Sequence, residues 1–209
     1  MRRRKTIAAV VLLIFSAVCV HAQSGGQRVT NVRVEKQPVF GPLFVTIAGK
    51  EKRISEQAQQ AWIINGGQHV IYSSSEGAGG FENEGQSLHL YDAGSGKHKR
   101  IMSEYFMVDD VKEVVTSNKR RALLVTMSDG GLGASYIAVV DPSRGEVFFR
   151  RWARILSHKG DTFVLGLYRE GDWEKLISGE GAKVRPYKRE QYDVKSLLRR
   201  RVIVNKRDY

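Results

Sequence analysis

Apolar and polar positions between residues 61 and 168 alternate in a way that predicts pairs of short strands joined by tight turns. The pattern occurs three times, in "AWIINGGQHVIYSS", "VKEVVTSNKRRALLVTMS" and "WARILSHKGDTFVLGLY". In each stretch two apolar segments flank a polar turn, and the Asn-Gly of the first is a strong hairpin signal because both residues tolerate positive φ. We therefore expect three antiparallel hairpins in succession.

A second kind of hairpin follows the first two of these at equivalent places. The glycine-rich connections "SSSEGAGGFENEGQ" and "SDGGLGA" lead into "SLHLYDAGSGKHKRI" and "SYIAVVDPSRGEVFF". Asp92 and Gly96 of the first hairpin lie 49 residues before Asp141 and Gly145 of the second. An aspartate that begins a turn accepts hydrogen bonds from nearby backbone amides, and a glycine supplies the left-handed residue that closes the turn. The sequence therefore predicts a repeated unit of four strands.

The flanking segments match this unit only in part. "VTNVRVEKQPVF" and "LFVTIAGKEKRI" predict two strands joined by a turn, and "SEQAQQAW" fits one helical turn. After the third hairpin, "GDWEKLISGEGAKVRPYKRE" contains no matching aspartate turn. We expect an all-β, mainly antiparallel fold of propeller-like four-strand repeats, two of them full and two partial. A small four-unit propeller, an open propeller fragment, a twisted β-sheet domain and a β-sandwich all agree with the pattern.

The repeats resemble the WD-type repeats of TolB-like β-propellers. In that family a turn of the kind "NGGQHVIYSS" is followed by a strand ending in a "YDAGSGK"-like turn, and the resemblance covers roughly residues 60–170. It implies a propeller architecture, and a periplasmic interaction protein whose rim receives a peptide or a partner protein. The chain is much shorter than a complete member of the family, so the resemblance indicates no specific partner.

The first residues predict export. Residues 2–5 are basic and residues 6–20 are apolar, a run shorter than the roughly 20 residues that span a bilayer. Val20 and Ala22 occupy the small-residue positions that a signal peptidase reads, so we expect a signal peptide over residues 1–22 with cleavage before Gln23. The remaining chain is then a soluble periplasmic or extracellular protein. An uncleaved membrane anchor is the alternative.

The net charge of +12 is concentrated at the two ends of the chain. Residues 2–5 contribute +4, residues 23–182 carry 20 basic and 19 acidic residues, and residues 183–209 carry ten basic and three acidic residues. We therefore divide the mature protein into a propeller-like β domain over 23–182 and a basic C-terminal extension over 183–209. Asp193 is a good N-cap for a short helix in "VKSLLRRR", and the alternation in "RRVIVNK" favours a last strand.

The basic extension predicts a charged surface. Its candidate surface residues are Lys195, Arg199, Arg200, Arg201, Lys206 and Arg207. In an exported protein we expect such side chains to contact an anionic envelope surface or an acidic partner, and not nucleic acid. A solvated face that only aids solubility is the alternative.

Sequence motifs of common catalytic sites are missing. The single cysteine, Cys19, lies in the predicted signal peptide, so disulfides, thiolate zinc sites and a cysteine nucleophile are excluded from the mature chain. No histidine pair has metal-ligand spacing, and no serine lies in a GxSxG turn. "DGGLGAS" is followed by a predicted strand, whereas a phosphate-binding glycine loop precedes a helix. We expect no catalytic residues and no cofactor.

One set of polar residues is predicted to share a rim of the propeller. The two glycine-rich connections occupy equivalent places in the repeat, so they should emerge side by side. The candidate binding residues on and next to them are Glu82, Asn83, Glu84, Asp129 and Tyr136. Their oxygens suit a Ca²⁺ ion, although the spacing matches no known calcium loop.

These observations favour an exported, non-catalytic binding or scaffold protein that engages a protein or peptide partner through its loops. The alternative is an exported hydrolase or lyase acting on envelope or extracellular glycans, in which Glu82, Glu84, Asp129 and His89 form the site. A pair of carboxylates at a suitable separation cleaves glycosidic bonds.

Overall fold

The computed structural model describes residues 26–35, 39–75, 86–104, 107–128, 135–177 and 184–199. Most of these residues lie in antiparallel strands that form three sheets. In this part of the chain no helix has the length and apolar character needed to cross a membrane. The fold is therefore all-β and mainly antiparallel, as the alternation predicts.

The strands follow one another in the sheets in chain order. The first sheet contains β1 (Val29–Val34), β2 (Gly41–Ile47), β3 (Lys50–Ile64), β4 (His69–Ser74), β5 (Gln86–Asp92) and β6 (His98–Glu104). The second contains β7 (Met107–Val115), β8 (Arg121–Ser128), β9 (Ser135–Asp141) and β10 (Glu146–Trp152). The third contains β11 (Arg154–Lys159), β12 (Thr162–Leu167) and β13 (Lys188–Asp193). Helix α1 (Glu170–Ile177) precedes β13 and helix α2 (Val194–Arg199) follows it.

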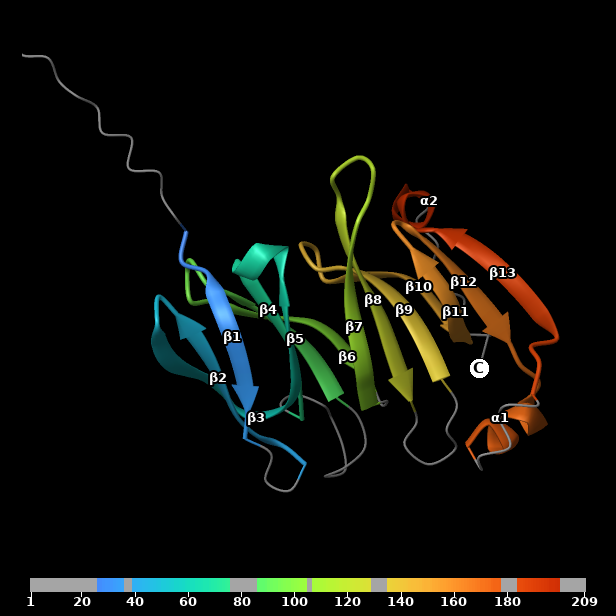
Figure 1. Ribbon diagram of the computed structural model, residues 1–209, viewed down its shortest axis with the longest axis horizontal. Helices are drawn as coiled ribbons and strands as arrows, with labels where there is room; N and C mark the ends of the chain where they lie inside the picture. The colour runs from blue at the N-terminus through green and yellow to red at the C-terminus, as the bar shows by residue number, and fades with distance from the viewer. Residues whose placement is uncertain are drawn as a thin grey trace, which may run out of the picture.

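The three sheets stand side by side as in a row of propeller blades (Figure 1). The blue β1 lies at one end of the row and the orange-red β13 at the other. The four-strand meander β7–β10 is the predicted full unit, and a second full unit is formed by β3–β6. The described residues thus form an open, incomplete propeller-like array, one of the arrangements predicted from the sequence.

Strand β3 corrects one prediction. "SEQAQQAW" forms no helical turn, because Ser55–Trp62 lie within this 15-residue strand. Ala58 pairs with Gly41 of β2 on one side and with Ser74 of β4 on the other. Backbone pairing on both sides outweighs the helical preference of alanine and glutamine. One strand consequently belongs to two sheet halves, β1–β3 and β3–β6.

Apolar side chains fill the spaces between neighbouring sheets. On β8, Leu123 and Val125 face the cluster shared with the first sheet, while Ala122 and Leu124 face the cluster shared with the third. Both faces of β8 and β9 are therefore buried, which explains why these two strands read as continuous apolar runs. A third cluster lies between the halves of the first sheet and contains Leu43.

The repeated turns have the predicted geometry. Gly96 and Gly145 both adopt left-handed φ, 69° and 70°. Their backbone amides donate to the carbonyl oxygens of Asp92 and Asp141, at 2.8 Å in each turn. The 49-residue repeat in the sequence is thus a repeat of local structure.

The C-terminal elements confirm the helix and its cap. The Asp193 carboxylate accepts a hydrogen bond from the backbone amide of Ser196 at 2.7 Å, so it caps α2. Strand β13, which precedes this helix and pairs with β12, escaped the sequence analysis. The strand predicted after the helix lies outside the described residues.

Candidate functional site: a groove on the first sheet

Most of the rim predicted from the sequence lies beyond the described residues. Glu82, Asn83, Glu84 and Asp129 all belong to the two connections that the structure does not describe. Their role in binding a partner or Ca²⁺ therefore stays a prediction.

Tyr136 is the second residue of β9, and its side chain lies in the core. Its side chain is 3% exposed and packs edge to face against Trp152, with the ring centroids 5.4 Å apart. It belongs to the apolar cluster between the first and second sheets. In this structure its ring has the surroundings of a core residue.

Two of the predicted basic surface residues are described. The Lys195 ammonium donates to the hydroxyl of Ser117 at 3.0 Å, which ties α2 to the β7–β8 turn. Arg199 is exposed at the end of α2. Arg200, Arg201, Lys206 and Arg207 lie outside the described residues, so a basic surface formed by all six stays a prediction.

A groove that the sequence analysis did not predict opens on the first sheet, between β3 and the strands β4–β6. Its volume is about 720 Å³. The lining residues are Arg53, Ile54, Ser55, Glu56, Tyr72, His89, His98 and Arg100. We name this pocket the His-Arg groove.

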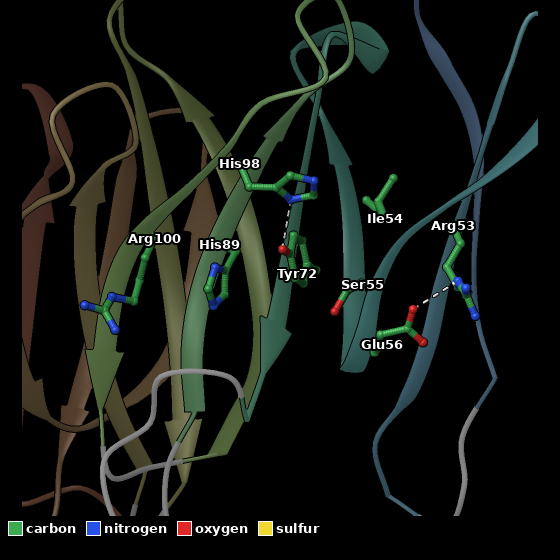
Figure 2. A pocket seen from close by; sticks show the side chains of 8 residues that line it. All are labelled: Arg53, Ile54, Ser55, Glu56, Tyr72, His89, His98 and Arg100. Atoms are coloured by element: carbon green, nitrogen blue, oxygen red, sulfur yellow. Dashed lines mark hydrogen bonds and ion pairs between the residues drawn. The ribbon is translucent and has the colours of Figure 1, made fainter.

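Strand register builds one wall of the His-Arg groove. Tyr72 pairs with His89, and His89 pairs with Arg100, so these three side chains form a row across β4, β5 and β6. Paired residues on neighbouring antiparallel strands project from the same face of a sheet. Figure 2 shows Arg100 at one edge of the pocket and Arg53 at the opposite edge, with the two histidine side chains between them.

Ring contacts hold the centre of this wall. The Tyr72 and His89 rings are stacked, with centroids 5.1 Å apart and planes inclined by 15°. The Tyr72 hydroxyl and the Nδ1 atom of His98 are hydrogen-bonded at 3.0 Å (Figure 2). Tyr72 itself is buried, so it fixes the positions of two imidazoles that reach the pocket.

The opposite wall comes from β3. Register shifts between β2 and β3 at this point add Ile54 to the strand, so that Ser55 pairs with Leu43 and Arg53 pairs with Phe44. Such a bulge turns neighbouring side chains to new directions. Ser55 is buried against the groove, whereas Arg53 and Glu56 form an exposed ion pair of 3.1 Å at its edge.

The groove is electrostatically biased toward anions. Two arginines and two histidines line it, and Glu56 is the single carboxylate among the described lining residues. Because Glu56 is already within 3.1 Å of Arg53, it offsets the arginine at the edge and lies on the far side from Arg100. An arginine binds a carboxylate through two parallel hydrogen bonds, and an imidazole adds a further donor.

Sequence reasoning missed this site because its residues are far apart in the chain. His89 and His98 read as ordinary strand and turn histidines, and only the β5–β6 register brings them together with Arg100. One signal was present: His89 interrupts the apolar run of "LHLY" in a strand that is otherwise largely buried. That signal indicates a polar position on the strand, but it does not identify the residues that lie next to it in the fold.

The candidate residues for metal binding and for a hydrolase lie mostly outside the described part of the chain. Within them, no group of three or more histidine, cysteine, aspartate or glutamate side chains could hold a metal ion. The carboxylates named for a hydrolase, Glu82, Glu84 and Asp129, are not described, and His89 lies in the His-Arg groove, whose lining contains Glu56 as its one described carboxylate.

Comparisons with known proteins give structural neighbours only. No protein-family model matches the sequence, and no curated protein matches it. The structure is similar to the β-propeller domain of the trilobed protease from Pyrococcus furiosus, with a TM-score of 0.43, 11% identity, and coverage of 68% of this chain and 48% of that one. It is also similar to an acylaminoacyl peptidase from Pyrococcus horikoshii, with a TM-score of 0.43, 14% identity, and coverage of 68% and 28%. The matched region is thus less than half of either neighbour.

Proposed function

We propose that this protein is a non-catalytic binding module whose His-Arg groove receives an acidic segment of a partner protein. One observation carries the proposal: strand register sets His89 and Arg100 side by side in an open groove, with His98 two rows further on and on the same face. A partner carboxylate at this point would accept hydrogen bonds from the exposed Arg100 and His98 side chains, whereas the Nε2 atom of His89 is buried.

The composition of the groove favours binding over catalysis. General acid–base cleavage by carboxylates needs two such groups near the scissile bond, and the described lining contributes Glu56 alone, held by Arg53. Buried Tyr72 positions the imidazoles by stacking and by a hydrogen bond. A cationic, open surface of this kind suits recognition of an anionic segment.

We also propose that the protein works outside the cytoplasm, because the basic start and short apolar run of residues 1–22 have the form of a signal peptide. Sequencing the N-terminus of protein purified from the periplasm or the medium tests this. A mature chain that begins at Gln23 is expected. Full-length protein retained in the cytoplasm or the membrane would contradict export.

The binding proposal is tested by titrating the protein with a capped octaglutamate peptide and following binding by isothermal calorimetry. The octaglutamine peptide serves as the uncharged probe. Replacing both arginines at the groove edges, Arg53→Gln with Arg100→Gln, is expected to weaken octaglutamate binding about tenfold, equivalent to about 1.4 kcal/mol. Salt should weaken binding as well, because exposed charges are screened at about 0.5 M ionic strength.

A matched control removes two positive charges elsewhere. Arg154 and Lys159 are exposed on β11, in the third sheet, and Arg154→Gln with Lys159→Gln changes the net charge by the same amount. This control should bind octaglutamate as the wild type does. An equal loss of octaglutamate affinity in both double variants would indicate attraction by net charge alone. Equal affinity of the wild type for octaglutamine and octaglutamate would show that the groove does not select acidic side chains. Either result rejects the proposal.

A further inference from the structure

A second pocket continues the His-Arg groove toward the turns at one end of the first sheet. Its volume is about 270 Å³, and it lies between the β2–β3 hairpin and the β5–β6 turn. The lining includes Lys50 and Lys52 from β3, Tyr91 from β5, and the turn glycines Gly94 and Gly96. We name it the lysine pocket.

Contacts between their lining residues make the lysine pocket and the groove neighbours. The Tyr91 ring lines the lysine pocket, and it lies against the His98 ring of the groove with the centroids 4.9 Å apart. The Lys52 ammonium lies 5.7 Å from the centre of the Tyr91 ring, and Lys52 directly precedes Arg53 at the groove edge. The two pockets therefore occupy successive positions along the same face of the sheet.

Successive side chains of β3 project to opposite faces, so the basic and acidic side chains at the start of "KEKR" lie on different faces of the strand. Lys52 pairs with Val45 of the internal apolar cluster, so Lys50 and Lys52 share the inner face of the strand. Glu51 lies between them and projects to the opposite face, where the Arg33 guanidinium donates to both of its oxygens at 3.2 and 2.9 Å. The intervening acid is thereby kept out of the pockets, and the inner face presents basic residues.

We propose that the lysine pocket and the His-Arg groove form one continuous site for an extended acidic peptide, with at least two successive carboxylate subsites. This inference rests on the proposed function and specifies its ligand. Lys50 and Lys52 hold carboxylates in the first subsite, while His98 and Arg100 hold them in the second. Such a site selects a run of acidic residues over a single small anion.

The dimensions of an extended chain agree with this arrangement. A strand advances about 3.3 Å per residue, so its alternate side chains, which project to one side, are about 6.6 Å apart. Lys50 and Lys52 follow this spacing on β3 and line the lysine pocket, and Ile54, at the bulge, lines the groove. A peptide lying along β3 would thus set two alternate glutamates opposite Lys50 and Lys52 before it reaches the groove. Gly94 and Gly96 line the turn end of this path.

The experiment compares octaglutamate binding to the wild type and to the Lys50→Gln, Lys52→Gln double variant. The variant is expected to bind about tenfold more weakly, while the Arg154→Gln, Lys159→Gln control is unchanged. Nuclear magnetic resonance spectra of ¹⁵N-labelled protein with octaglutamate should show shifts at the amides of both pockets, including those of Lys52, Gly96 and Arg100. Because the substituted lysines are exposed on a strand, unchanged spectra elsewhere would show that the variant is folded.

The outcomes separate this inference from the proposed function. In one outcome octaglutamate binds and the arginine variant weakens binding, but the lysine variant binds as the wild type does and the amides of residues 50–52 do not shift. The continuous site is then wrong, and the single groove remains. If octaglutamate does not bind at all, both are wrong. If dextran sulfate binds far more tightly than octaglutamate and is sensitive to the same lysines, the site is for an acidic polysaccharide, and the assignment to a peptide is overturned.

Discussion

At the scale of single residues, the equivalent turn aspartates Asp92 and Asp141 share a local hydrogen-bond pattern but differ in burial and in their distant partners. The side chain of Asp92 is 38% exposed, accepts from the Ser95 amide at 2.6 Å, and lies 3.1 Å from His69. That of Asp141 is 6% exposed; it accepts from the Ser143 amide at 3.0 Å and from the Arg120 guanidinium at 3.1 Å. Arg120 in turn donates to the Leu198 carbonyl of α2. The second aspartate therefore joins its turn to the rest of the molecule.

The pKa values of both aspartates are lowered. For Asp141, burial raises the pKa, but hydrogen bonds from Ser143 and Arg120 outweigh this effect and hold it below its ordinary value. For Asp92, the hydrogen bond from the Ser95 amide is the main reason for a lowered pKa. A carboxylate with a lowered pKa in the folded state stabilises the protein above its unfolded pKa of about 3.9, and this stability is lost as the pH falls through the folded value.

We predict that Asp141→Asn lowers the free energy of unfolding by about 2 to 3 kcal/mol at pH 7, because it weakens charge-assisted hydrogen bonds at a buried site and leaves Arg120 without its counter-ion. Asp92→Asn should have a smaller effect because Asp92 is more exposed. Urea unfolding at pH 7 and near pH 3 measures both. The difference between wild type and Asp141→Asn should shrink at the lower pH, and a difference that does not change with pH would contradict the role of the charge.

At the scale of elements, the β3–β4 turn shows why a hairpin needs particular residues. Asn65, Gly66 and Gly67 all have left-handed φ, at 53°, 57° and 87°. Gly67 also packs against the start of β1, where a β-carbon on it would lie 2.5 Å from the Val29 carbonyl oxygen. Gly66 has no atom within 4 Å of the same position. Both glycines allow the left-handed backbone conformation. Gly67 also allows the close approach of β1.

These two glycines form a matched pair for mutation. Gly66→Ala should destabilise the protein by about 1 to 2 kcal/mol, the usual effect of a β-carbon in the left-handed conformation. Gly67→Ala should destabilise it by clearly more, because β1 must also move away from the turn. Thermal unfolding of the two variants compares them directly, and equal losses of stability would show that β1 does not pack on the turn as described.

At the scale of the whole molecule, the sheets form a one-dimensional array in which each contacts its neighbours through an apolar cluster. The β7–β10 sheet lies in the middle of the row (Figure 1) and is covered on both faces. The edge strands β1 and β11, which belong to the two outer sheets, are largely exposed. In such arrays stability comes from the interfaces between units, so the ends open more readily than the middle.

We predict that hydrogen exchange followed by mass spectrometry will find the slowest amides in β8 and β9. Amides of β1 and β11 should exchange at least about tenfold faster, because local opening there exposes one apolar interface instead of two. In a matched measurement, bound octaglutamate should slow hydrogen exchange in β3 and β6, which contribute residues to the two pockets. Uniform protection across all strands would show that the array unfolds as a single unit.

The features that follow from the sequence alone are those governed by neighbouring residues. The Asn65 turn, the Asp92 and Asp141 turns and the Asp193 cap depend on side chains and amides a few residues apart, so each was predictable from local chemistry. The predicted repeat and the all-β class follow from the same turns and from strand alternation. Periodicity also favours buried strands wherever apolar runs are continuous.

Tertiary structure alone decided the features that depend on register and on partners distant in the chain. β3 became one strand because β2 and β4 pair with its two halves, which outweighs the local preference of "SEQAQQAW". His89 and Arg100 became neighbours because the β5–β6 pairing shifts by one residue between Leu88 and His89. Local chemistry specifies that a strand forms and where it turns, whereas the alignment of two strands depends on packing across the whole sheet. The candidate site therefore appears only in the folded protein.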